Sequence, residues 1–263
     1  MDLGLKGKIA LVCAASQGLG FAVADELAAE GSSLVICSRN QENLDKAAAS
    51  ISEKHGTKVL TVIGDLSVTS DVERIVNAGL ERFGQIDILV TNSGGPPAGS
   101  FDSLTNESWD AATRILLTSV VNLTRLVLPG MKERGWGRIL NITSIASKQP
   151  VDNLMLSNSL RAAVTGFAKT LANEVAADGV TVNNILPGYT RTDRLVELFD
   201  FNAKKEGITT DQVIARWESE IPMRRLAEPR EFGALAAFLV SERASYITGS
   251  SIAVDGGWIK SLF

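Results

Sequence analysis

Short apolar runs rich in β-branched residues alternate with longer amphipathic stretches along the whole chain. The runs lack strict alternation of polar and apolar positions, which is typical of strands buried on both faces of a parallel sheet. The longer stretches repeat apolar residues every three or four positions, as expected for helices that cover such a sheet. In residues 71–83, which Gly84 ends, the apolar face consists of Val72, Ile75, Val76 and Leu80.

The order of these patterns predicts the elements of the fold. The predicted strands are residues 9–14, 34–37, 58–63, 86–91, 138–143, 180–186 and 251–254, and the predicted helices are 21–30, 41–55, 71–83, 109–134, 154–177 and 229–239. This alternation predicts an α/β fold in which residues 1–263 form one dinucleotide-binding domain. Its core would be a single doubly wound (Rossmann-type) seven-stranded parallel sheet with helices on both faces.

Residues 190–220 break this rhythm. They are rich in charge and follow the carboxyl end of a predicted strand, where ligands bind in folds of this type. We predict a lid-like insertion that covers a bound ligand. A surface insertion without such a role is the alternative.

Composition narrows the possible partners. The chain has 263 residues, of which 45% are hydrophobic, enough for one large core. A formal net charge of −4 argues against a nucleic-acid partner, and the apolar runs are too short to span a membrane. The N-terminal residues form no apolar signal segment, so we expect a cytoplasmic protein.

The cysteines and the histidine limit the chemistry. Cys13 and Cys37 lie in predicted strands and are interpreted as reduced core residues. His55 is the only histidine, which excludes a Ser-His-Asp triad and most histidine-based metal sites. We therefore expect no metal.

A loop of small residues links the first predicted strand to the first predicted helix. Strand, loop and helix N-terminus together form a site for the pyrophosphate of a dinucleotide. Gly18 lets the backbone come close to the phosphates, and Gly20 lets the helix pack close to the sheet. The predicted contacts are Ser16, Gly18, Leu19 and Gly20. A tight turn without a ligand is the alternative.

The residues at the end of the second predicted strand indicate which dinucleotide the site prefers. Folds of this type that bind NAD commonly place a carboxylate here to hold the ribose 2′-hydroxyl. Ser38 and Arg39 stand there instead, and they can hydrogen-bond and charge-pair with a 2′-phosphate. NADP(H) is therefore the preferred cofactor and NAD(H) stays open, with a solvated surface arginine as the alternative.

Six ordered motifs resemble those of the short-chain dehydrogenases/reductases, over nearly the whole chain. The first loop resembles the family's TGxxxGxG, with Cys13 and Ala14 in place of its first two residues. The others are Asp65-Leu66, Thr91-Asn92-Ser93-Gly94, Asn141-Ile142-Thr143-Ser144, Pro187-Gly188-Tyr189-Thr190-Arg191-Thr192, and a C-terminal signature at residues 246–249 and 254–257.

This resemblance implies a nicotinamide-dependent oxidoreductase that acts on a small-molecule substrate, with Ser144 as the catalytic serine. It also implies that the cofactor contacts residues at the ends of several strands. These are Asp65, Leu66, Asn92, Ser93, Gly94, Pro187, Gly188, Thr190 and Thr192.

The chain departs from the family pattern at the other catalytic positions. The family's acid/base tyrosine corresponds to Ser157 here, and its lysine four residues later corresponds to Arg161. Leu116 stands where the family usually has a structural asparagine. A serine hydroxyl is a much weaker acid than a phenol, and an arginine stays charged and cannot shuttle a proton. The i, i+4 spacing nevertheless places Ser157 and Arg161 on one helix face as a polar pair.

Three functions fit these residues. The first, favoured because the cofactor motifs are retained, is an oxidoreductase that acts on a carbonyl or alcohol with a non-standard proton donor. The second is a catalytically inactive NADP(H)-binding sensor or partner protein. The third is non-redox chemistry on an anionic substrate, held by Arg161, Lys148 and Arg191.

For the first function the proton donor has to be found elsewhere. Tyr189 is the candidate, because it lies in the motif that resembles the nicotinamide-contacting loop, and Lys148 and water are further donors. The candidate catalytic residues are therefore Ser144, Ser157, Arg161 and Tyr189.

Two predicted helices bear on assembly. Helices that correspond to residues 109–134 and 154–177 often pair across a dimer in the family. The second is apolar nearly all round, through Ala162, Ala163, Val164, Phe167, Ala168 and Leu171. Such a helix is expected to be buried on two sides, so we predict a homotetramer or a homodimer.

Overall fold

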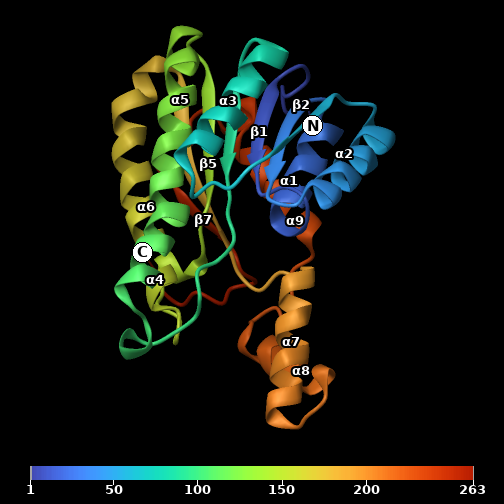
Figure 1. Cartoon of the computed structure of the whole chain (residues 1–263), viewed down its shortest axis with the longest axis vertical. Helices are drawn as coiled ribbons and strands as arrows, with labels where there is room; N and C mark the ends of the chain where they lie inside the picture. Colours follow the sequence, from blue (N-terminus) through green and yellow to red (C-terminus); the bar gives the residue numbers. More distant parts are fainter. Residues whose placement is uncertain (1, 263) are drawn as a thin grey trace.

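All seven predicted strands form and pair in parallel in one sheet (Figure 1), in a computed structural model that describes residues 2–262. They are β1 (Ile9–Cys13), β2 (Ser33–Ser38), β3 (Val59–Ile63), β4 (Ile88–Thr91), β5 (Gly137–Ile142), β6 (Val180–Pro187) and β7 (Ser251–Val254). Their order in the sheet is β3-β2-β1-β4-β5-β6-β7. The direction of winding therefore reverses between β1 and β4, the place where doubly wound sheets bind ligands. The predicted fold class is confirmed.

Helices cover both faces of the sheet, as its predominantly apolar strands require. The helices on one face are α1 (Gly18–Ala29), α2 (Gln41–His55) and α9 (Pro229–Leu239), and those on the other are α3 (Thr69–Phe83), α5 (Ser119–Glu133) and α6 (Met155–Val175). Alternate residues of β1 reach the two cores. Ala10 and Val12 belong to the first core, and Leu11 and Cys13 to the second.

A ladder of polar side chains, three of them buried, crosses the sheet from β4 to β7. Thr91, Asn141, Asn184 and Ser251 are register partners on β4, β5, β6 and β7. Thr91 Oγ1 donates to Asn141 Oδ1 (2.8 Å), and Asn141 Nδ2 donates to Asn184 Oδ1 (3.0 Å). Asn184 Nδ2 in turn donates to Ser251 Oγ (2.9 Å). Because an unpaired buried polar group is costly, each bond favours one register of the next strand.

The helix predicted over residues 109–134 begins earlier than expected and contains a wider turn. α4 (Asn106–Thr113) continues through a π-helical turn, Arg114–Thr118, into α5. By length and composition alone the stretch Asn106–Glu133 could cross a membrane. Here α5 packs against α3 and the sheet, as a helix that covers a core does.

Residues 190–220 contain two helices, α7 (Asp193–Glu206) and α8 (Thr210–Glu220), which project from the sheet and its covering helices in Figure 1. They form a small core of their own with Phe199, Ala203, Val213, Ile221 and Leu226, which partly buried aromatic side chains join. The sequence predicted an insertion here but no helices, because these apolar residues face a local core and do not follow the rhythm of the sheet.

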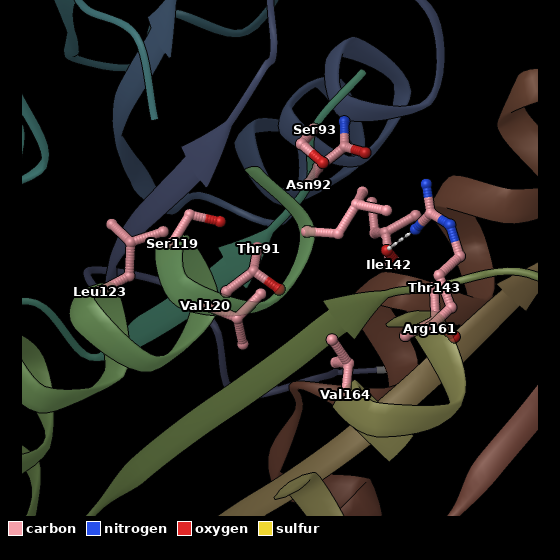
Figure 2. Close-up of a pocket in the computed structure, with 11 residues that line it drawn as sticks. Thr91, Asn92, Ser93, Ser119, Val120, Leu123, Ile142, Thr143, Arg161 and Val164 are labelled. Atoms are coloured by element: carbon pink, nitrogen blue, oxygen red, sulfur yellow. Dashed lines mark hydrogen bonds between the residues drawn. The ribbon is translucent and has the colours of Figure 1, made fainter. Parts of the chain in front are cut away.

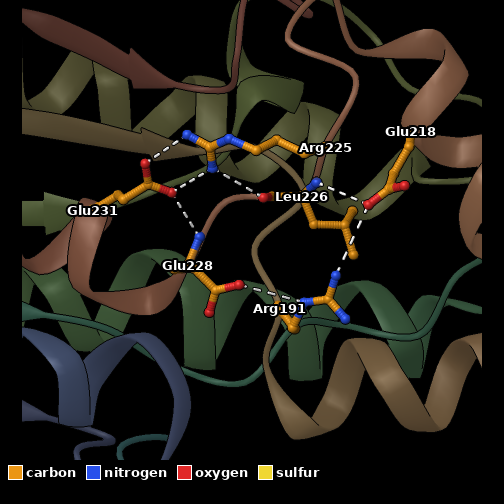
Figure 3. A network of polar contacts seen from close by, with 6 residues as sticks. All are labelled: Arg191, Glu218, Arg225, Leu226, Glu228 and Glu231. Atoms are coloured by element: carbon orange, nitrogen blue, oxygen red, sulfur yellow. Dashed lines mark hydrogen bonds and ion pairs between the residues drawn. The ribbon is translucent and has the colours of Figure 1, made fainter.

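Ion pairs connect the residues on either side of the α7–α8 pair to the start of α9 (Figure 3). Arg191 pairs with Glu218 of α8 (3.9 Å) and with Glu228 (3.5 Å). Arg225 donates two hydrogen bonds of 2.7 Å to Glu231. These bonds, with one from the backbone N–H of Glu228, lower the pKa of the Glu231 carboxyl to about 2. Pairs this exposed contribute more to orientation than to stability.

One carboxylate joins α1 to the end of α2. Asp25 accepts a hydrogen bond from Lys54 (2.7 Å), and its other oxygen lies 2.8 Å from His55 Nε2. Burial on its own would raise the pKa of Asp25, but the hydrogen bonds from Lys54 and His55 outweigh it and lower the pKa below its ordinary value of 3.8. The ionised carboxylate therefore stabilises the folded state.

Replacing Asp25 by Asn should lower the free energy of unfolding at neutral pH by about 1–2 kcal/mol, because hydrogen bonds to a charge are lost. The contribution of the carboxylate is complete above its unfolded-state pKa and is lost as the pH falls through the lowered folded-state pKa. The difference from wild type should therefore be constant above about pH 5 and shrink below pH 3.8. Urea unfolding at a series of pH values measures it.

The matched control is Glu42→Gln, which removes the exposed ion pair between Glu42 and Lys46. This change should alter the free energy of unfolding by less than about 0.5 kcal/mol at every pH. Equal effects of the two substitutions at neutral pH would contradict the stabilising role of Asp25.

Candidate functional site

The loop between β1 and α1 has the shape that a pyrophosphate requires. Gly18 opens α1 with a φ of +61°, a backbone conformation that favours glycine. A Cβ on Gly20 would overlap the carbonyl oxygen of Ala14, so only glycine lets α1 approach this closely. Within residues 2–262 the side chain of Gln17 makes no capping hydrogen bond to the first turn of α1. The N–H groups of that turn are therefore open to an anion.

Ala14 has a backbone conformation that is unusual for a residue other than glycine. Its φ is +48°, in the left-handed region that a residue with a Cβ seldom adopts. Asn92 Nδ2 donates to the Ala14 carbonyl (3.4 Å) and so joins the loop after β4 to the loop after β1. The predicted residues Asn92, Ser93 and Gly94 thus lie beside the phosphate loop, at the switch point of the sheet.

The residues predicted for the adenine end lie where β2 and β3 finish. Ser38 Oγ donates to the carbonyl of Asn40 (3.1 Å), and Arg39 beside it is exposed to solvent. Asp65 follows β3, and its Oδ1 accepts from the N–H and hydroxyl of Ser67 at 2.8 and 2.7 Å. Leu66 is buried in the core between the sheet and α3. These side chains share the carboxyl edge with the phosphate loop.

The loop after β6 reaches the same edge from the other side. A Cβ on Gly188 would lie 2.7 Å from the Cα of Asp255, and its N–H donates to the carbonyl of Val254 (2.9 Å). Thr192, the residue before α7, lies 3.7 Å from the position of a Cβ on Gly18. The loop that begins at Pro187 and contains Thr190 therefore extends to the phosphate loop.

Two serine hydroxyls each accept a hydrogen bond and keep a proton to donate. Ser144 Oγ accepts from the N–H of Ala146 (3.1 Å), in a short turn after β5. Ser157 Oγ, on the first turn of α6, accepts from Arg161 Nε (3.3 Å). A hydroxyl whose oxygen is engaged in this way can still donate to a third partner, such as a carbonyl oxygen.

Arg161 joins α6 to the end of β5 (Figure 2). Its Nη1 donates to the carbonyl oxygen of Ile142 (3.1 Å), while its Nε holds Ser157. The guanidinium lines a small cavity together with Asn92 and Ser93 from the loop after β4. Leu116, on the π-helical turn, lines the same cavity. Sequence reasoning identified the i, i+4 pair but not its bond to the sheet, because that bond depends on tertiary packing.

Tyr189 lies in a different pocket. Its ring packs edge-on against Trp217 and Trp258, with centroids 4.6 and 5.9 Å away. The pocket of about 370 Å³ that it lines is completed by Met223 and by residues 253–257, among others, and does not include Arg161. Burial raises the pKa of the Tyr189 hydroxyl, and the charge of Glu220 raises it further. The structure therefore makes Tyr189 a weaker proton donor than an ordinary tyrosine.

Comparison with known proteins agrees with this arrangement. The model of a family described as Enoyl-(Acyl carrier protein) reductase matches residues 13–259. Dehydrogenase/reductase SDR family member 4 of Oryctolagus cuniculus is 35% identical over 96% of the chain and 94% of its own length. D-beta-hydroxybutyrate dehydrogenase of Cupriavidus necator is 36% identical over 97% of the chain and 99% of its own length.

Among solved structures, L-sorbose reductase from Gluconobacter frateurii, complexed with NADPH and L-sorbose, superposes with a TM-score of 0.97. It is 36% identical to this chain, and the match covers 100% of both chains. The fold and the phosphate loop define a Rossmann-type oxidoreductase. The chain belongs to the short-chain dehydrogenase/reductase family.

The close approach of α1 to the phosphate loop at Gly20 can be tested without a ligand. Gly20→Ala should lower the free energy of unfolding by about 2–3 kcal/mol, because the new methyl group forces α1 away from the Ala14 carbonyl. Gly166→Ala in α6 is the matched control, since in the described part of the chain a Cβ there would meet no atom within 4 Å beyond its own stretch of helix. That change should leave stability unchanged or raise it by up to about 1 kcal/mol. Urea unfolding of both variants measures the difference, and equal effects would contradict the close approach at Gly20.

Proposed function

We propose that the protein is an NADP(H)-dependent oxidoreductase that interconverts a carbonyl and an alcohol in a small-molecule substrate, with a proton donor other than a tyrosine. Membership of the family and the likeness to a reductase complexed with NADPH support the reaction class. The observation that carries the proposal is the Ser157–Arg161 pair, which is tied to the end of β5 at the cavity beside the switch point.

The cofactor would lie along the carboxyl edge of the sheet. Arg39 and Ser38 suit a 2′-phosphate, since neither is a carboxylate that would repel it. The open first turn of α1 suits the pyrophosphate, with Ser16, Gly18, Leu19 and Gly20 as the cradle. Further contacts would come from Asp65, Leu66, Asn92, Ser93, Gly94, Pro187, Gly188, Thr190 and Thr192. When bound, NADPH supplies a hydride to the carbonyl carbon.

The chain's own residues would act on the carbonyl oxygen. The hydroxyls of Ser144 and Ser157 would donate hydrogen bonds to this oxygen. Their own oxygens already accept hydrogen bonds from N–H groups of the chain, so the hydroxyl protons can be used for the substrate. Negative charge develops on the carbonyl oxygen as the hydride arrives. The permanent positive charge of Arg161 would stabilise this negative charge through the Ser157 hydroxyl, as a preorganised dipole does in an oxyanion hole.

Water is the proton donor that these side chains favour. Water is no stronger an acid than a serine hydroxyl, but, unlike the hydroxyls of Ser144 and Ser157, it exchanges with bulk solvent, which takes up the hydroxide left when water protonates the alkoxide. Arg161 does not give up a proton. The raised pKa of Tyr189 and its place among the tryptophans argue against that residue. Lys148 follows the Ser144 turn and is exposed, so it remains a second candidate.

The proposal is tested by mixing the purified protein with NADPH and a panel of ketones, quinones and β-keto esters and following the absorbance of the reduced nicotinamide. We expect NADPH oxidation with at least one carbonyl, and a fall in kcat/KM of roughly 100-fold in Ser144→Ala. Tight NADPH binding without turnover would favour the inactive sensor or partner protein. No binding would contradict both functions and leave the non-redox alternative.

Tyr189→Phe is the matched control, since it removes one hydroxyl and keeps the ring between the tryptophans. We expect turnover within about twofold of wild type. Loss of turnover with unchanged affinity for NADPH would restore Tyr189 as the donor.

We also propose that the chain forms a homotetramer or a homodimer. On α6, Val164, Ala168 and Leu171 are buried by the sheet, whereas Ala162 and Ala163 are exposed in the single chain. An apolar helix face left open in this way is expected to be covered by a second subunit. Light scattering at micromolar concentration should give a multiple of 28.0 kDa, and a monomer would contradict the assembly. The expected cytoplasmic location accords with the free thiols of Cys13 and Cys37 and stays a prediction.

A further inference from the structure

The small cavity beside Arg161 has room for one water molecule. Its volume is about 10 Å³, close to the space that a single buried water needs. Four parts of the chain enclose it: the end of β4, the π-helical turn with the start of α5, the end of β5, and α6. Its polar lining residues are Thr91, Asn92, Ser93, Ser119, Thr143 and Arg161.

Thr143 lines this cavity and has an unsatisfied hydroxyl. The residue is 3% exposed, and among the described residues its Oγ1 has no hydrogen-bond partner. The backbone N–H of Thr143 is engaged, since it donates to the carbonyl of Ile185 (3.0 Å). Buried hydroxyls are normally paired, with protein or with ordered water. An orphan hydroxyl at a space of this size therefore points to a bound water.

Two other threonine hydroxyls in the described part of the chain are buried without a partner, those of Thr124 and Thr190. Neither residue lines this cavity. The coincidence of an unpaired hydroxyl, a one-water space and several polar neighbours thus singles out Thr143. Thr124, on α5, offers a matched comparison, because it is the same residue type with the same exposed fraction of 3%.

We propose that the cavity binds one water molecule, hydrogen-bonded to Thr143 Oγ1 and to the Arg161 guanidinium, and that Thr143 is a positioning residue that acts through this water. A guanidinium only donates hydrogen bonds, so it offers an N–H to the water oxygen. The Thr143 hydroxyl can either donate a hydrogen bond to the water or accept one from it, so the water can link Thr143 to Arg161 in both cases. The catalytic consequence rests on the function proposed above, whereas the water site itself does not.

The water matters because Arg161 is long and flexible. Its Nη1 and Nε hydrogen-bond to Ile142 and Ser157, and the side chain also lines the cavity. An ordered water fills that cavity without adding a charge, and it restricts the rotamers open to the side chain. A fixed guanidinium holds the Ser157 hydroxyl in one orientation toward the substrate oxygen.

The test compares three substitutions in the full-length protein. Thr143→Val replaces the hydroxyl by a methyl group of similar size, Thr143→Ser keeps the hydroxyl, and Thr124→Val removes the unpartnered hydroxyl outside the cavity. Crystal structures of the wild type and of the Thr143 variants show whether a water is present. Thermal unfolding and steady-state NADPH oxidation measure the consequences.

We expect a water in wild type and in Thr143→Ser, and none in Thr143→Val. Thr143→Val should lower the Tm by about 2–4 °C, because a satisfied buried hydrogen bond is lost, and lower kcat by roughly 3- to 10-fold. Thr143→Ser should restore kcat, and Thr124→Val should leave kcat unchanged and the Tm unchanged or higher. A role of Thr143 in packing alone would not give rescue by serine.

A wild-type crystal structure with an empty cavity would overturn the proposal. So would a Thr143→Val variant that behaves like Thr124→Val in both Tm and kcat. If the wild type oxidises no NADPH, the proposed function fails on its own, and the water site is still decided by the crystal structures and the Tm values.

Discussion

Three buried polar side chains, Thr91, Asn141 and Asn184, hydrogen-bond to one another and to Ser251 only while β4, β5, β6 and β7 keep one register. This register also fixes the segments that leave the carboxyl ends of the strands, where the candidate site lies. Asn92 reaches back to the carbonyl of Ala14, Ile142 offers its carbonyl to Arg161, and Gly188 meets Val254. A shift of one residue in any strand would turn its side chains to the opposite face and separate these partners.

Ser157 and Arg161, two of the candidate catalytic residues, form a hydrogen-bonded pair on α6. Ser157 and Arg161 are joined to each other and to the sheet, so the first turns of α6 cannot move independently of β5. The shorter serine side chain leaves the hydroxyl close to the helix, and the longer arginine extends back toward the strand. Under the proposed function, the pair would stabilise charge and orient a hydroxyl, but a serine is a much weaker acid than a tyrosine.

Local patterns were enough to predict the strands and the loop between the first strand and the first helix, because apolar periodicity and glycine act within a few residues. The strand order, and with it the switch point, depends on long-range pairing and was not predicted. The i, i+4 relation of Ser157 and Arg161 was predictable because it too is local. The π-helical turn around Leu116 and the positive φ of Ala14 were not, since both depend on how distant segments pack. The surroundings of Tyr189 could not be predicted from its motif, because they are made by Trp217 and Trp258, which come from α8 and from the C-terminal segment; its role as a donor stays a prediction.

Among the residues that line the cavity in the described chain, Arg161 alone carries an ionisable group. A guanidinium keeps its charge throughout the pH range in which proteins work. The local electrostatic potential is therefore constant with acidity, and this part of the site has no side chain to store a proton between turnovers. Under the proposed function, a reaction beside this cavity would take its proton from solvent or from a group outside the cavity lining, such as Lys148.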